Sequence, residues 1–215
     1  MDRPFTSDIP APVLDAIQNG TSRTVYRGVS FLKSPFDVVL YLQLLHRLQP
    51  RTVIEIGSKH GGSALWFADM MSAQGVTAPR IVSVDIRPLA TFTDERITFL
   101  TGNARNLGPT LTPDLLANLP RPWLVIEDSA HTYDASRAVL DFFHPLLVSG
   151  DYIVVEDGVV SQLSDPLYAS YEDGPNRAVA DVLALHPSAY AVDTDLCDHF
   201  GRNATYNPNG WLRRI

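Results

Sequence analysis

Five carboxylates stand at the ends of apolar segments in this sequence, where they could bind a cation or hold a nucleoside. They are Glu55, Asp85, Asp128, Glu156 and Asp157. The runs before them are rich in β-branched residues, which predicts buried strands that end in acid. In an open α/β sheet the ligand crevice lies at the carboxyl ends of the strands. Because so much negative charge in one crevice is unfavourable, we expect a compensating cation there.

The last three of these carboxylates favour a metal. Asp128, Glu156 and Asp157 follow two segments that we expect to be neighbouring strands, and three carboxylates with open positions suit a hard, octahedral cation, above all Mg²⁺. The alternative is that one or two of them cap helices or form ion pairs with arginine. The arginines considered for such pairs are Arg105, Arg137 and Arg177.

A glycine-rich turn follows Glu55 and favours an anionic ligand. Gly57 and Gly61 permit positive φ and close backbone approach, and a helical pattern begins directly behind them. The spacing is not G-x-G-x-x-G, because three residues separate these glycines. Asp85 lies at the end of the next apolar run, where a carboxylate can accept both hydroxyls of a ribose.

The elements that must position these residues follow from periodicity. We expect strands at 53–56, 81–86, 97–100, 123–128 and 152–157, and helices at 35–48, 64–71, 111–119, 133–143 and 177–185. Two late strands, 189–192 and 211–215, have no predicted helix between them and should pair antiparallel. The fold class predicted is therefore α/β: a doubly wound, Rossmann-like sheet, mostly parallel with an antiparallel C-terminal strand.

Composition limits the function classes. The chain has 215 residues, which suits one main domain, and its net charge of −7 argues against nucleic acid as a partner. Its single cysteine, Cys197, excludes an internal disulfide framework. No apolar run is long enough for a membrane span, and no signal peptide is visible, so we expect a cytoplasmic protein. We divide the chain into an N-terminal cap or leader, 1–30, and a ligand-binding domain, 31–215.

Several motifs together resemble the cephalosporin hydroxylase family. They are Lys-Ser-Pro-Phe-Asp at 33–37, the segments 55–63, 126–131, 147–157 and 174–179, and Tyr-Asn-Pro-Asn-Gly-Trp-Leu-Arg-Arg at 206–214. The similarity covers residues 28–215, and the glycine turn also resembles the first motif of class I S-adenosylmethionine (SAM) methyltransferases. The resemblance implies a SAM-binding fold, a divalent metal on Asp128, Glu156 and Asp157, and relatives that O-methylate sugars or other secondary metabolites, including in antibiotic biosynthesis.

Two further sets of candidate residues complete the predicted site, beside the metal ligands. Asp128 and His131 are the candidate catalytic residues, with His131 either a general base or a partner that holds Asp128. The residues expected to bind SAM are Glu55, Gly57, Ser58, Gly61, Gly62, Ser63, Asp85, Asn103, Ala104 and Asp128.

The function predicted is methyl transfer from SAM to a hydroxyl of a small, sugar-containing secondary metabolite, assisted by Mg²⁺. Three alternatives stay open: metal-independent N-methylation of an aminated sugar, a hydroxylase or other oxidoreductase, and a non-catalytic nucleoside-binding module. The acceptor should be small and polar, with a cationic one not excluded, and a homo-oligomer is left open. In the amine alternative the same carboxylates, Asp128, Glu156 and Asp157, would grip the amine without a metal. The acidic residues that could add to such a site are Glu172, Asp173, Asp193, Asp195 and Asp198.

Overall fold

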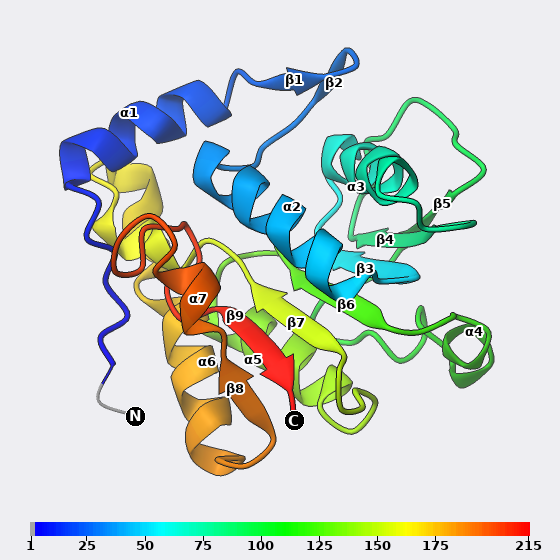
Figure 1. Cartoon of the computed structure of the whole chain (residues 1–215). Helices are drawn as coiled ribbons and strands as arrows, with labels where there is room; N and C mark the ends of the chain where they lie inside the picture. The colour runs from blue at the N-terminus through cyan, green and yellow to red at the C-terminus, as the bar shows by residue number, and fades with distance from the viewer. Residues whose placement is uncertain (1–2) are drawn as a thin grey trace.

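A twisted sheet of seven strands forms the centre of the molecule, seen in the computed structural model, which describes residues 3–215 (Figure 1). The order across the sheet is β5-β4-β3-β6-β7-β9-β8. The first five strands in this order are parallel, and β9 runs antiparallel to both of its neighbours. The strands are β3 (Thr52–Ile56), β4 (Arg80–Asp85), β5 (Ile97–Thr101), β6 (Trp123–Glu127), β7 (Tyr152–Val155), β8 (Tyr190–Val192) and β9 (Trp211–Arg214).

Helices cover both faces because alternate strand residues point to opposite sides. Val53 packs in a core with α2 and α3, whereas its neighbour Ile54 packs in a second core with α5 and α6. Figure 1 shows these pairs on opposite faces of the sheet. The helices are α2 (Pro35–Leu48), α3 (Gly62–Ala73), α4 (Pro113–Ala117), α5 (Tyr133–Phe143) and α6 (Gly174–Leu185).

The fold confirms the predicted class, with local differences. The helix expected at 111–119 is shorter, since Thr112 caps it and the turn ends at Ala117. A short helix, α7 (Thr194–Cys197), lies between β8 and β9, where we expected none; the Asp193 side chain accepts from Leu196 N and starts it. The antiparallel pairing of these strands is confirmed.

Two further segments lie at the carboxyl end of the sheet. One consists of α1 (Ala11–Thr21) and the small hairpin β1 (Val25–Tyr26) and β2 (Val29–Ser30). The other contains the 3₁₀ helices η1 (Gly158–Gln162) and η2 (Pro166–Tyr171), in the long loop after β7. They touch through Ser164 N, which donates to Asp15, and Gln18, which donates to the Tyr168 hydroxyl. The boundary predicted at residue 30 stays a prediction, and residues 1 and 2 lie outside the described part.

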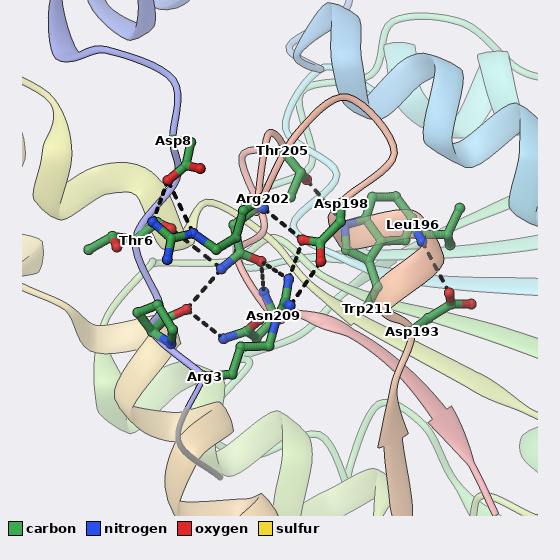
Figure 2. A network of polar contacts seen from close by, with 12 residues as sticks. Arg3, Thr6, Asp8, Asp193, Leu196, Asp198, Arg202, Thr205, Asn209 and Trp211 are labelled. Atoms are coloured by element: carbon green, nitrogen blue, oxygen red, sulfur yellow. Dashed lines mark hydrogen bonds and ion pairs between the residues drawn. The ribbon is translucent and has the colours of Figure 1, made fainter.

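The start of the described chain is tied to the tail before β9 (Figure 2). Arg3 donates to Asp198, Asn203 and Asn209, and Asn203 and Asn209 donate back to the carbonyl of Pro4. These contacts fix the tail 203–209, which reaches the cavity described below. Within residues 3–215 no helix has the length and apolar character needed to cross a membrane.

Candidate functional site

A cavity of about 730 Å³ opens at the carboxyl ends of the central strands. Loops after β3, β4, β5, β6 and β7 form its floor, and α1, η1 and η2 contribute to its wall. Its position is the one expected for the ligand crevice of an open α/β sheet. The cavity has one half around the glycine turn and Asp85, and a second half around the acids that follow β6 and β7.

In the first half, Asp85 presents a carboxylate whose two oxygens are already anchored. Oδ2 accepts from Lys59 N and Oδ1 from Arg87 N, each at 2.8 Å. A carboxylate has about four acceptor positions, so each oxygen retains capacity for a ligand hydroxyl. Asn103 and Ala104 line the same half of the cavity, with the exposed side chain of Ile86 beside them. This half can hold a ribose and an apolar ring.

The glycine turn is shaped mainly by contacts within the protein. Gly57 has φ +111°, and a Cβ there would lie 1.8 Å from the Asp128 carbonyl oxygen; Gly61 has φ +79° and faces the ring of Phe99. Both positive φ values agree with the sequence prediction, but Gly61 does not line the cavity. Glu55 does not line it either; its side chain is fully buried and accepts from Ser83 Oγ at 2.7 Å.

The other predicted SAM-binding residues lie at the cavity wall. Ser58 lies in this wall, and its hydroxyl is buried and has no hydrogen-bond partner in the described chain. The wall residues from the predicted set are Gly57, Ser58, Gly62, Ser63, Asp85, Asn103, Ala104 and Asp128.

The second half of the cavity contains a cluster of two acids and a histidine. Asp128, His131 and Asp157 can each offer one atom such that all three atoms lie within 4.8 Å of one another. His131 Nε2 is 3.5 Å from Asp157 Oδ2. Two carboxylates that face a solvent-accessible cavity are suitable ligands for Mg²⁺, which prefers oxygen and retains bound water.

Two members of this cluster have unusual backbones. His131 has φ +52° and Asp157 has φ +59°, in the left-handed region that few residues other than glycine adopt, although asparagine, aspartate and histidine adopt it more often than most. Asn207 Oδ1 accepts from Asp157 N at 3.0 Å and holds this conformation from the tail. Such strain persists only where the surroundings enforce it, and it is common at functional sites.

Glu156, the predicted third ligand, is not part of this group. Lys33 Nζ lies 2.6 Å from Glu156 Oε2 and 2.6 Å from Asp128 Oδ2, and the Tyr41 hydroxyl donates to Glu156 Oε1. Both oxygens of Glu156 therefore have protein partners, and Lys33 supplies positive charge to this pair of acids in addition to any metal. The arginines considered as partners contact other groups: Thr132, Asp141, and the pair Glu172 and Asp173.

Burial controls protonation in this region. It raises the pKa of Asp128 to about 6 and that of Glu156 to about 7, although the Lys33 ammonium opposes both shifts. Burial likewise raises the pKa of Asp157. Burial alone would lower the pKa of His131, but the carboxylates of Asp157 and Asp128 outweigh it and raise that pKa above its ordinary value.

Sequence reasoning missed Lys33 as part of the site. The chain has only two lysines, Lys33 and Lys59, and both line this cavity. That scarcity, in a chain with many arginines, was the available signal. It also missed the tyrosines of the acceptor side, Tyr168, Tyr171 and Tyr206. Tyr171 stacks edge-on against the His131 ring, with centroids 5.5 Å apart.

The acids considered for gripping an amine are not gathered at the cavity. Asp193 binds Arg47 and the Tyr152 hydroxyl, and Asp198 binds Arg3. Asp195 lines a separate groove between α2 and β8. The residues that line the main cavity include none of the five, so the amine alternative keeps only the acids of the cluster, Asp128 and Asp157, as its support.

Known proteins are similar over nearly the whole chain. Rhamnosyl O-methyltransferases are 30% identical over 90% of this chain and 79% of the relative in Mycobacterium tuberculosis, and 33% identical over 89% and 83% in Mycobacterium leprae. A solved structure of CmcI with Mg and SAM is 25% identical, with a TM-score of 0.67 over 90% of this chain and 77% of that one.

A TDP-rhamnose 3'-O-methyltransferase of calicheamicin biosynthesis shares the fold, at 19% identity and a TM-score of 0.53 over 97% of this chain and 88% of that one. The model of the rhamnosyl O-methyltransferase/CmcI family matches residues 19–215. The family predicted from the motifs is thereby confirmed. The chain belongs to the rhamnosyl O-methyltransferase/CmcI family.

Proposed function

We propose that this chain is a SAM-dependent methyltransferase that methylates a hydroxyl of a sugar, with a rhamnosyl group of a small secondary metabolite as the acceptor. The observation that carries this proposal is the single cavity that joins the Asp85 half to the cluster of Asp128, His131 and Asp157. Family membership and rhamnosyl-methylating relatives support the reaction and the acceptor. SAM supplies an activated methyl group, so the protein mainly has to align it with the acceptor.

The wall of the Asp85 half fits SAM. The remaining acceptor capacity of Asp85 suits the ribose hydroxyls, and Asn103 and Ala104 suit the adenine edge. The carboxylate of Glu55 is buried away from the cavity and accepts a hydrogen bond from Ser83 Oγ. Glu55 therefore supports the strand end below the glycine turn and does not contact SAM directly.

The donors of the second half fit Mg²⁺, which the CmcI structure contains together with SAM. Asp128 and Asp157 would hold it, with His131 beside them. Bound there, Mg²⁺ would supply Lewis-acid polarisation that lowers the pKa of an acceptor hydroxyl. The carboxylates must be ionised to bind it, so their raised pKa values predict weaker metal binding below about pH 6.

His131 is placed to take the proton of the acceptor. Its Nδ1 is buried without a hydrogen-bond partner in the described chain, so contact with an acceptor is through Nε2. The proton that arrives on Nε2 is stabilised by Asp157 Oδ2, 3.5 Å away. His131 thus acts as general base, and Asp157 supports the imidazolium.

The wall formed by η1 and η2 suits a deoxysugar. Val159, Val160 and Leu163 are apolar, and Tyr168 and Tyr171 offer aromatic faces with polar tips. An aromatic surface of this kind packs against the C–H face of a sugar, and the hydroxyls orient it.

The test is an acceptor panel with SAM, measured by mass for one added methyl group. It contains an aryl rhamnoside, the matching fucoside, and an aminosugar glycoside, each with Mg²⁺ and with EDTA. We expect O-methylation of the rhamnoside in the presence of Mg²⁺ and its loss in EDTA. Methylation of the aminosugar nitrogen in EDTA would replace this proposal by the metal-independent N-methyltransferase. No SAM binding by calorimetry would overturn it altogether.

A further inference from the structure

Asp37 is a buried acid on α2 that takes no part in the site described so far. It ends the motif at 33–37, is only 3% exposed, and does not line the cavity. Its carboxylate accepts from the Thr205 hydroxyl and from Tyr206 N, the latter at 3.1 Å. A carboxylate is buried at a cost in free energy, so the bonds that it makes are the place to look for its role.

The Thr205 hydroxyl passes this contact on to the tail. A hydroxyl has one hydrogen to donate and two lone pairs, and here the hydrogen points to Asp37. The lone pairs accept from Asn207 N and from Trp211 Nε1 (Figure 2), each at 3.1 Å. Asp37 therefore fixes the direction of the hydroxyl and, through it, the position of Asn207.

The tail in turn holds the backbone around Asp157. Asn207 Oδ1 accepts from Asp157 N at 3.0 Å, and the Tyr206 carbonyl accepts from Val159 N at 3.1 Å. Asp157 has φ +59° between these two bonds, so the turn relaxes to a commoner conformation only if one of them breaks. The direction in which the Asp157 carboxylate enters the cavity thus depends on residues 205–207.

We propose that Asp37 is a positioning residue that holds the Asp157 carboxylate in the geometry used for metal binding. It acts through Thr205 and Tyr206, which keep the turn at Asp157 closed. The proposal rests on the role that the proposed function gives to Asp157. These bonds act on the second half of the cavity, so SAM binding in the Asp85 half should be independent of Asp37.

Hydrogen exchange in the metal-free protein tests the first step. NMR would follow the amides of Asp157 and Val159 in the wild type and in Asp37→Ala. We expect both amides to exchange about tenfold faster or more in the variant, because the tail no longer holds them. Amides of the central strand β3 report global opening and should change less. Equal acceleration in β3 and at the turn, or none at the turn, would overturn the proposal.

Titration calorimetry with Mg²⁺ and Mn²⁺ tests the consequence for the site. Asp37→Ala should bind metal about tenfold more weakly or worse, because a group that orients a ligand is lost. Its SAM affinity should stay within about threefold of the wild type. Asp37→Asn should restore most of the metal affinity, because Oδ1 alone already accepts from both Thr205 and Tyr206 N. If Asp37→Asn binds metal as weakly as Asp37→Ala, hydrogen bonding to the tail is not the cause and the proposal fails.

Asp151→Ala is the matched control for the loss of a buried carboxylate. Asp151 is 1% exposed and accepts from Trp123 N and Val148 N, both at 2.9 Å. It precedes β7, whereas Asp157 follows it, so the two lie at opposite ends of that strand. Asp151→Ala should lower the melting temperature but leave the metal affinity within about threefold. An equal loss of metal affinity in Asp151→Ala and Asp37→Ala would show a general loosening of the fold and refute the positioning role.

Thr205→Val tests the same chain of bonds if Asp37→Ala does not fold. It removes the hydroxyl between Asp37 and Asn207 and leaves the bond from Tyr206 N to Asp37 in place. We therefore expect a smaller effect, about three- to fivefold on metal affinity and on exchange at Asp157 N. Wild-type values of both quantities in Thr205→Val would contradict the proposal.

These measurements separate the inference from the proposed function. If Asp37→Ala opens the turn at Asp157 but no sugar is methylated by the wild type, the positioning role stands and the acceptor assignment fails. If the wild type methylates the rhamnoside and Asp37→Ala leaves the turn unchanged, methyl transfer stands and the positioning role fails. The exchange measurement decides the role of Asp37 even if the wild type binds no metal.

Discussion

Two ionic networks in this molecule use similar contacts at different depths. In the buried network, one ammonium, Lys33, serves Asp128 and Glu156. In the outer network, Arg96 donates to Asp94 and Asp69 at 2.6–2.8 Å, and Arg27 also donates to Asp69. The outer network joins the β1–β2 hairpin to α3 and to the start of β5.

The consequences for the carboxylates are opposite. Hydrogen bonds from Arg96 lower the pKa of Asp94 to about 2, whereas burial raises the pKa of Asp128 to about 6 and that of Glu156 to about 7. The outer network has two guanidinium groups for two acids, and water reaches it. The buried network has one ammonium and the further charge of Asp157 nearby. A short N···O distance alone therefore does not distinguish a structural ion pair from a site that can accept another cation.

The largest expected effect comes from Asp157→Asn. Loss of the carboxylate that we propose to bind metal and to support His131 should lower kcat/KM on the order of 100-fold or more. The melting temperature of the metal-free protein should stay the same or rise, because burial disfavours the charge of Asp157 and asparagine tolerates its positive φ. Steady-state kinetics and thermal melting of the same preparation measure both. A large loss of melting temperature would show that Asp157 has a structural role.

An intermediate effect is expected from pH, measured by urea unfolding of the metal-free wild type and Glu156→Gln. The pKa of Glu156 is raised from 4.5 to about 7 in the folded state. Its contribution to stability is therefore full below about pH 4.5 and is lost as pH rises through about 7. Between pH 5 and pH 8, the free energy of unfolding of Glu156→Gln should rise by on the order of 1–3 kcal/mol relative to that of the wild type. If the difference in unfolding free energy between the variant and the wild type stays constant across this pH range, the pKa of Glu156 is near its ordinary value.

The smallest effect is expected from Asp94→Asn in the outer network. The pKa of Asp94 is lowered from 3.8 to about 2, so its contribution to stability is present above pH 3.8 and is lost as pH falls through about 2. At pH 7 we expect the free energy of unfolding to fall by about 1 kcal/mol, since the ion pair is near the surface. We expect kcat/KM to stay within about threefold of the wild type. Urea unfolding at pH 7 and pH 2 measures the difference, which should shrink at the lower pH. If Asp94→Asn lowered kcat/KM as much as Asp157→Asn does, the outer network could not be regarded as structural and the buried network as functional.

The sheet could be predicted because its strands are continuous apolar runs that end in acid, and α5 because its apolar stripe is regular. Local exceptions depend on single side chains: α7 begins because Asp193 caps it, and α4 ends early after its Thr112 cap. Periodicity does not report such caps in a segment of four or five residues.

The site could be predicted as a set of strand ends, since the fold places Asp85, Asp128 and Asp157 at one edge. What could not be predicted is which positively charged group neutralises each of these acids. Lys33 and Glu156 are 123 positions apart, and no local pattern connects them. The role of Gly61 could not be predicted either, because a glycine that faces Phe99 and one that faces a ligand have the same sequence signature. The same holds for Glu55, whose carboxylate is buried and accepts from Ser83.

The place of β9 in the sheet has a consequence for the order in which the molecule can be assembled during synthesis. β9 lies between β7 and β8, although it is made after both. Until residues 211–214 have emerged, the side of β7 that β9 will cover is an open edge, and β8 has no place to dock. The five parallel strands can form first. We expect the tail 203–209, and with it the Asn207 bond that sets the Asp157 backbone, to be fixed only when β9 inserts, so a nascent chain forms its five parallel strands before its candidate site is complete.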